Sequence, residues 1–147
     1  MEKRPKQVAV ELKTAIEDNG QKEYNTVRES GQLYQQTNMD VLTYTETAGD
    51  GSQISNMITI HANKASVKRT GPVQMHQTFH EQKLSENVFQ HPHGNIHMET
   101  FTDSIDYRPL TARQNGVLAI DYTVRLNGQE EREHELTLTI RPKEGSQ

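Results

Sequence analysis

Apolar residues recur at every second position along most of the chain, and this alternation constrains the fold more than any other feature. It is clearest in residues 8–16 and 118–140. Successive side chains of a β-strand point to opposite faces of the sheet, so a period of two is typical of strands with one buried and one wet face. Only residues 103–109 suggest anything else, and there we expect at most one short helical turn. A parallel sheet needs crossover helices, so the pattern predicts an all-β, antiparallel fold.

Turn signals separate the alternating runs at regular intervals. Asn127-Gly128 lies between two such runs, which is the strongest short-range indication of a β-hairpin, and Asn19-Gly20 ends the first run in the same way. Gly31 is expected to break the second strand. The succession of hairpins predicts 8–10 strands in an up-and-down barrel, because closure removes the strand edges that an open meander leaves exposed. The 147 residues fit one domain, with its core at about residues 7–141 and short flexible termini.

Composition and charge exclude several classes of protein. Hydrophobic residues make up only 31 % of the chain, which suits strands with one wet face. Sixteen basic against twenty acidic residues leave no basic footprint for nucleic acid. The absence of cysteine excludes disulfides and thiolate chemistry. No apolar run is long enough for a membrane span or a signal peptide. We therefore expect a cytoplasmic protein with neither nucleic-acid nor membrane partners.

The alternation also predicts which polar residues point into the barrel. Met75 and Phe79 set an inward face that Arg69 and Gln77 share. Glu86 lies at the centre of the next apolar run, 84–88, and a two-residue turn at Glu81-Gln82 would place it opposite Gln77. The predicted polar residues of the interior are Arg69, Gln77, Glu86, Thr100, Thr102 and Tyr122.

A charge inside a barrel must be paired or must face a wet cavity, since desolvation otherwise costs several kcal/mol. An Arg69–Glu86 ion pair, hydrogen-bonded through Gln77 and Tyr122, would close one end of the core. Alternatively, Arg69 would meet an anionic head group in a small pocket whose aliphatic residues hold a tail. In that second case the ligand-binding residues are Arg69, Gln77, Glu86, Thr100 and Tyr122.

Histidines cluster in the middle of the chain, where five of the seven fall between residues 76 and 97. On a strand, the Cα atoms of His76 and His80 are about 13 Å apart, so the two cannot chelate one ion. A rigid His91-Pro92-His93 loop could bring two imidazoles together, with His97 as a doubtful third ligand. We expect no physiological metal and no cofactor, and the weak metal candidates are His91, His93 and His97.

Several segments of the chain resemble the YwiB-like family of uncharacterised bacterial β-barrel proteins. The resemblance rests on residues 67–73, Phe79, Gly94, Thr100 and residues 116–122. It implies a calycin-like, lipocalin-related barrel over roughly residues 7–141, and it implies no catalytic or binding residues. The chain departs from the family over residues 89–94, where members tend to carry an aromatic residue, Thr-Pro and then Gly, and this chain has Phe89-Gln90-His91-Pro92-His93-Gly94.

Three functions follow, in decreasing order of support. The first is a non-enzymatic barrel that binds a small, partly apolar and in one version anionic molecule in its lumen. The second is a protein–protein interaction or scaffolding module with a fully packed core, for which a homodimer is reasonable. The third is an enzyme with Glu86, His93 and Asp121 as nominal acid–base residues, although nothing in the sequence brings these three together.

Overall fold

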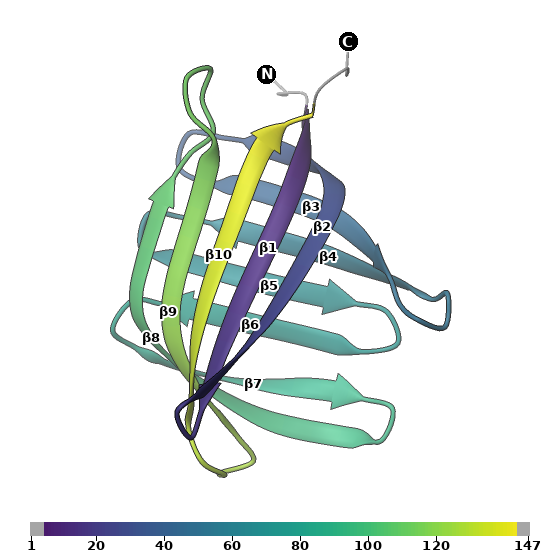
Figure 1. The fold of residues 1–147 in the computed structure, drawn as a ribbon, viewed down its shortest axis with the longest axis vertical. Helices are drawn as coiled ribbons and strands as arrows, with labels where there is room; N and C mark the ends of the chain where they lie inside the picture. The colour runs from purple at the N-terminus through teal and green to yellow at the C-terminus, as the bar shows by residue number, and fades with distance from the viewer. Residues whose placement is uncertain (1–4, 144–147) are drawn as a thin grey trace.

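The chain forms a closed antiparallel barrel of ten strands (Figure 1). A computed structural model describes residues 5–143, apart from the side chain of His91. Each strand pairs with its neighbours in sequence, and β1 pairs with β10 to close the barrel, as the alternation predicts. The described residues contain no helix long and apolar enough to span a membrane. The strands are β1 Lys6–Asp18, β2 Gln21–Gln35, β3 Asp40–Thr47, β4 Gln53–Ile60, β5 Lys64–Thr70, β6 Gln74–His80, β7 Leu84–His91, β8 Gly94–Arg108, β9 Gly116–Leu126 and β10 Arg132–Pro142.

One end of the barrel is tightly packed, and we call it the closed end. Here β2 pairs with β3 through residues 31–35 and 40–44. Tyr107 donates a hydrogen bond of 2.6 Å from its hydroxyl to Asp40, and Leu110 is buried over the same end, where its carbonyl accepts a hydrogen bond from Gln35. Six apolar side chains of the core are completely shielded from solvent: Val8, Leu33, Leu42, Phe79, Leu138 and Ile140.

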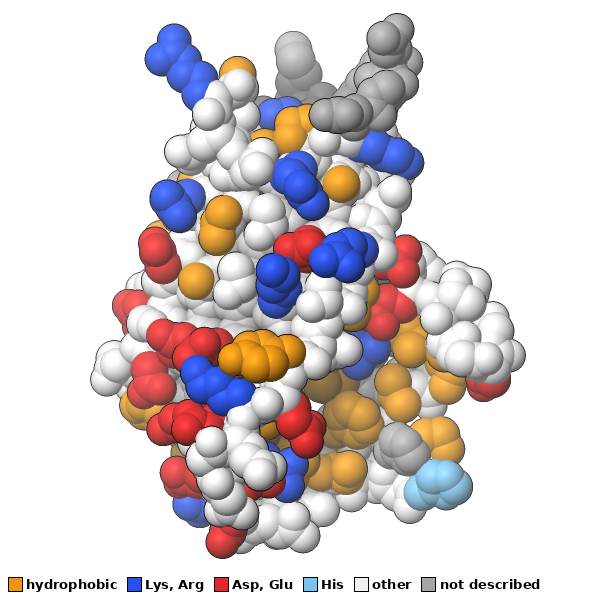
Figure 2. All heavy atoms as spheres, viewed as in Figure 1, with side chains coloured by type: hydrophobic (Ala, Val, Ile, Leu, Met, Phe, Trp, Pro, Cys, Tyr) orange, Lys and Arg blue, Asp and Glu red, His pale blue; other side chains and the backbone are white. Residues whose placement is uncertain are grey.

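The rest of the wall is interrupted on two sides, and we call this part the open half. The pairing of β2 with β3 ends at Gly31 and Tyr44, so residues 21–30 of β2 pair with β1 alone. Strands β6 and β7 pair at one position, Gln74 with Gln90. Figure 2 shows the corresponding side of the molecule hollowed beside the β1–β2 hairpin, with hydrophobic side chains on its floor and charged side chains along its upper margin.

The predicted helical turn at 103–109 is wrong, because β8 continues as a strand to Arg108. Thr102 faces Tyr122 and Ser104 faces Asp121, so Asp103 is the extra residue of a β-bulge. The bulge brings Thr102 and Ile105 to the same buried face although they are three residues apart. That spacing imitates the period of a helix.

The predicted orientation of β7 is also wrong, and Glu86 is not in the interior. The pairing of Gln74 with Gln90 places the loop at residues 81–83, one residue longer than predicted. Gln82 in this loop has a left-handed φ of 62°. A register shift of one residue turns every side chain to the other face. Consequently Leu84, Glu86 and Val88 are exposed on the outside of the barrel.

Candidate functional site

A cavity of about 180 Å³ lies inside the open half of the barrel. Side chains from β1 to β6 and from β9 and β10 line it, and they reach it because each occupies the inward face of its strand. Its apolar wall consists of Leu12, Val27, Ile58, Val67, Met75 and Leu136. Its polar wall includes Asn25, Glu46, Asn56, Arg69, Gln77 and Tyr122.

Arg69 points into the cavity, as predicted, but its partner is Glu46 and not Glu86. The Nη2 atom of Arg69 lies 3.2 Å from Oε2 of Glu46. The two residues meet across β4, where Asn56 pairs with both Arg69 and Tyr44, the inward neighbour of Glu46. The Arg69 side chain is 29 % exposed, yet its Nε atom is buried and has no hydrogen-bond partner. The guanidinium therefore retains one donor inside the open half that the described residues do not satisfy.

Gln77, Thr100 and Thr102 all lie in the interior, as predicted. The side-chain amide of Gln77 donates a hydrogen bond of 2.9 Å to Oγ1 of Thr100, and both residues are buried. Gln77 lines the cavity, whereas Thr100 is completely buried at the far end of this hydrogen bond. Oγ1 of Thr102 is buried without a partner. Gln77 is therefore not the bridge of an Arg69–Glu86 pair, since it bonds to β8.

Tyr122 is buried in an aromatic stack at the wall of the cavity. Its ring meets the edge of Phe79 at 4.7 Å and stacks on His134 at 5.0 Å. Burial raises the pKa of Tyr122 well above the usual range, so the hydroxyl stays protonated. No described residue forms a hydrogen bond with that hydroxyl, although only 6 % of Tyr122 is exposed.

Sequence reasoning missed His134, which stacks on Tyr122 next to the cavity. Burial, together with a smaller effect of the positive charge of Arg132, lowers the pKa of His134 to about 4. The side chain is therefore a neutral imidazole at physiological pH. The signal was present in the sequence, because His134 has the parity of Leu136, but it was obscured by the charged residues on either side.

Two carboxylates that sequence reasoning also missed lie where β2 and β3 separate. Glu46 shares the inward face of β3 with Tyr44, and Glu29 shares the inward face of β2 with the buried Gly31. Burial raises the pKa of Tyr44 to about 12, and the negative charges of Glu46 and Glu29 contribute in the same direction. The negative charges of Glu46 and Glu29 therefore both raise the pKa of the Tyr44 hydroxyl, where the open half begins.

The histidine cluster and the nominal acid–base residues do not form a site. The side chain of His91 lies outside what the structure describes, and His97 is exposed beside Glu99, with Nε2 and Oε1 3.9 Å apart. Among the side chains that the structure describes, no group of three or more His, Cys, Asp and Glu could hold a metal ion. Glu86, His93 and Asp121 are each exposed and do not line the cavity.

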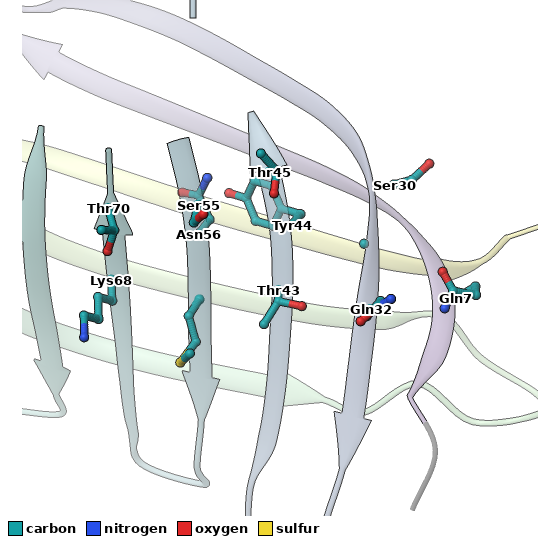
Figure 3. A pocket seen from close by; sticks show the side chains of 12 residues that line it. Gln7, Ser30, Gln32, Thr43, Tyr44, Thr45, Ser55, Asn56, Lys68 and Thr70 are labelled. Atoms are coloured by element: carbon teal, nitrogen blue, oxygen red, sulfur yellow. The ribbon is translucent and has the colours of Figure 1, made fainter. Parts of the chain in front are cut away.

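A second hollow, of about 550 Å³, lies on the outer face of β2–β5 (Figure 3). Its lining is mostly small hydroxyl and amide side chains, such as Thr43, Ser55 and Gln32, with Lys68 as a charged member. Most of these residues are exposed, so a ligand there would keep much of its own hydration. The cavity in the open half shields a ligand better and combines apolar walls with buried polar groups, which is the usual composition of a small-molecule site.

Comparisons with known proteins agree with this architecture. The chain is 25 % identical to the uncharacterised β-barrel protein YwiB of Bacillus subtilis (strain 168) over 132 residues, which cover 90 % of this chain and 91 % of YwiB. The crystal structure of YwiB superposes with a TM-score of 0.83 at 24 % identity, over 96 % of this chain and 94 % of that one. The model of the domain of unknown function DUF1934 matches residues 10–138. The chain therefore belongs to the DUF1934 family of uncharacterised β-barrel proteins.

Proposed function

We propose that this protein binds a small, partly apolar molecule in the open half of its barrel. The observation that carries the proposal is the cavity itself, with aliphatic walls and the inward-facing polar groups of Arg69, Gln77 and Tyr122. A core that served only for stability would gain from filling this space, because buried voids lose packing contacts. We propose in addition that the ligand binds in the lumen, as in calycin-like barrels, and that the protein is cytoplasmic.

The size of the cavity limits the ligand. A volume of about 180 Å³ holds about six waters at the ~30 Å³ that each occupies in the liquid. Sites for drug-sized molecules are typically about 300–1,000 Å³. The ligand is therefore a small metabolite, or a larger molecule of which only one end enters while the rest extends through the opening beside β2.

A thermal-shift screen of short-chain alcohols, amines and carboxylates tests the proposal. A ligand present at 100 times its Kd adds about 2.7 kcal/mol to the free energy of unfolding. In a chain of this length that raises Tm by several degrees. If no compound raises Tm, and native mass spectrometry of the freshly purified protein shows no bound molecule, the proposal fails.

A matched pair of variants then locates the binding. Val67→Trp fills the cavity, whereas Val88→Trp adds the same side chain to an exposed position on the outside. Only Val67→Trp is expected to abolish the Tm shift. If that variant does not fold, Asn25→Trp serves instead, since Asn25 is exposed at the edge of the cavity. Equal ligand shifts in all variants would place the binding elsewhere.

The second candidate is a protein–protein interaction through the outer face of β7. Leu84 and Val88 are 55 % and 50 % exposed there, beside the partly buried Phe101 of β8. Such residues could pack against a second copy of the chain. Analytical ultracentrifugation at increasing concentration tests this, and a protein that stays monomeric would weigh against a homodimer.

A further inference from the structure

The charged residues that face the open half carry more negative than positive charge. Glu46 on β3 and Arg69 on β5 line the cavity, and Glu29 lies on the inward face of β2 two residues beyond Val27, which lines it. At the tip of the β1–β2 hairpin, Arg132 and Asp18 lie 3.5 Å apart and neutralise each other. Arg69 and Glu46 do the same at 3.2 Å. The carboxylate of Glu29 has no such partner among the described residues.

The position of Glu29 explains why the wall opens there. Strands β2 and β3 pair up to Gly31 and Tyr44, and two further residues in the same register would place Glu29 opposite Glu46. Like charges directly opposite each other destabilise an antiparallel pair. The strands separate at this point, and no described residue forms an ion pair or hydrogen bond with the Glu29 carboxylate. The separation thus keeps a carboxylate without a partner next to two residues of the cavity wall, Val27 and Tyr44.

We infer that the cavity prefers a ligand with a positively charged primary ammonium group on a short apolar chain. This inference rests on the proposed lumen binding and specifies the charge of the ligand. The ammonium group would lie between Glu29 and Glu46, and the chain would lie along Leu12, Val27 and Val67. A cation at this position compensates the unpaired carboxylate, and charge-assisted hydrogen bonds are about twice as strong as neutral ones.

A second, independent feature supports a polar ligand inside the cavity. The hydroxyl of Tyr122 has no hydrogen-bond partner among the described residues, although the residue is only 6 % exposed and lines the cavity. Among the described residues, the buried side-chain atoms without a partner are Nε of Arg69 and Oγ1 of Thr102, so the Tyr122 hydroxyl itself is accessible from the cavity, where a hydrogen-bonding ligand or water can reach it. A phenol accepts a hydrogen bond from an N–H donor as well as donating one.

The anionic head group expected from the sequence fits this arrangement less well. That expectation needed Arg69 to be free, but Arg69 is already paired with Glu46. An anion would find only the Nε–H of Arg69 unpaired, and there it would approach two carboxylates. The repulsion between like charges at such short range weakens binding, and more so in a partly desolvated site.

The test compares n-hexylamine, n-hexanol and n-hexanoate at about pH 7, because the three share one alkyl chain and differ in charge. Affinity is measured by isothermal titration calorimetry on the full chain. Hexylamine is expected to bind most tightly, and its affinity is expected to fall with added salt. The Glu29→Gln variant is expected to lose about tenfold in affinity for hexylamine, the size of one charge-assisted hydrogen bond. Its affinity for hexanol should not change.

The matched control is Glu86→Gln, which changes the net charge equally but lies exposed on the outside of the barrel. It should bind hexylamine like the parent protein. Glu29→Gln is expected to fold at least as stably as the parent, since it removes the repulsion from Glu46. Equal binding of hexylamine and hexanol, or tighter binding of hexanoate, would overturn the ammonium preference and leave lumen binding intact. If none of the three compounds binds, the proposed function itself fails.

Discussion

His134 is a neutral imidazole that stacks on the aromatic ring of Tyr122, with the ring centroids 5.0 Å apart. Its pKa of about 4 lies below the ordinary value of 6.5, chiefly because burial disfavours the charged form. Between these two values the unfolded chain binds more protons than the folded protein. The free energy of unfolding therefore falls as the pH drops from about 6.5 towards 4.

We expect His134→Gln to reduce this acid sensitivity. The contribution of His134 has a slope of at most about 1.4 kcal/mol per pH unit within the window. Carboxylates contribute acid sensitivity to parent and variant alike, so the difference between the two slopes reports on His134. Urea unfolding at several pH values between about 4 and 7 measures it. His76→Gln, at an exposed position on the outside, should retain the parent slope, and an equal slope in His134→Gln would contradict the assignment.

Gly31 is required because its neighbours leave no room for a side chain. A Cβ atom there would lie 2.7 Å from the carbonyl oxygen of Thr43 and 3.2 Å from both Tyr44 and Val10. Gly31→Ala is therefore expected to cost about 1–3 kcal/mol in the free energy of unfolding, as overpacking does elsewhere. The control is Gly49→Ala, where a Cβ atom would meet nothing within 4 Å and the change should be small. Denaturant unfolding compares the two, and equal losses would contradict this account.

At the scale of the strands, the inward and outward faces were predicted correctly wherever the turn between two strands fixed their pairing register. Asn127-Gly128 has left-handed φ values of 50° and 70°, and the alternation of β9 and β10 on either side was predicted correctly. Gly31 was expected to break a strand, but β2 runs through it, because a glycine permits close approach as readily as a turn. The loop at 81–83 and the bulge at Asp103 each add one residue that alternation alone does not reveal.

The orientation of β7 can be tested, because Leu84 faces solvent in the structure whereas the alternation of apolar residues predicts that it faces the interior. If Leu84 faces solvent, Leu84→Thr should change the free energy of unfolding by no more than about 0.5 kcal/mol. Had it pointed inward, its replacement would resemble that of a core leucine. Leu118, which is 1 % exposed, serves for comparison, and Leu118→Ala should cost about 2–5 kcal/mol. Similar losses from both changes, measured by urea unfolding, would support the inward orientation instead.

At the scale of the whole molecule, the site depends on distances that no single strand encodes. The parity of β5 and β6 was sufficient to place Arg69 and Gln77 in the interior, and the same reasoning placed Tyr122 there from β9. The ion pair of Arg69 with Glu46 could not be predicted, because it needs the registers of β3, β4 and β5 together. The opening of the wall could not be predicted either, because it depends on the position at which β2 and β3 stop pairing.

The division into a closed end and an open half should be visible in native-state hydrogen exchange. In residues 21–30 of β2, the amides that point away from β1 lack a partner strand, since pairing with β3 begins at Gly31. These alternate amides are expected to exchange fast, at nearly unprotected rates, whereas amides of residues 31–35 exchange only through larger openings of the barrel. A ligand in the cavity would bridge β2 and β3 and should slow exchange next to Asn25 and Val27. Uniformly slow exchange along β2, measured by NMR, would mean that the barrel is closed along its whole length in solution and that a ligand must enter by another route.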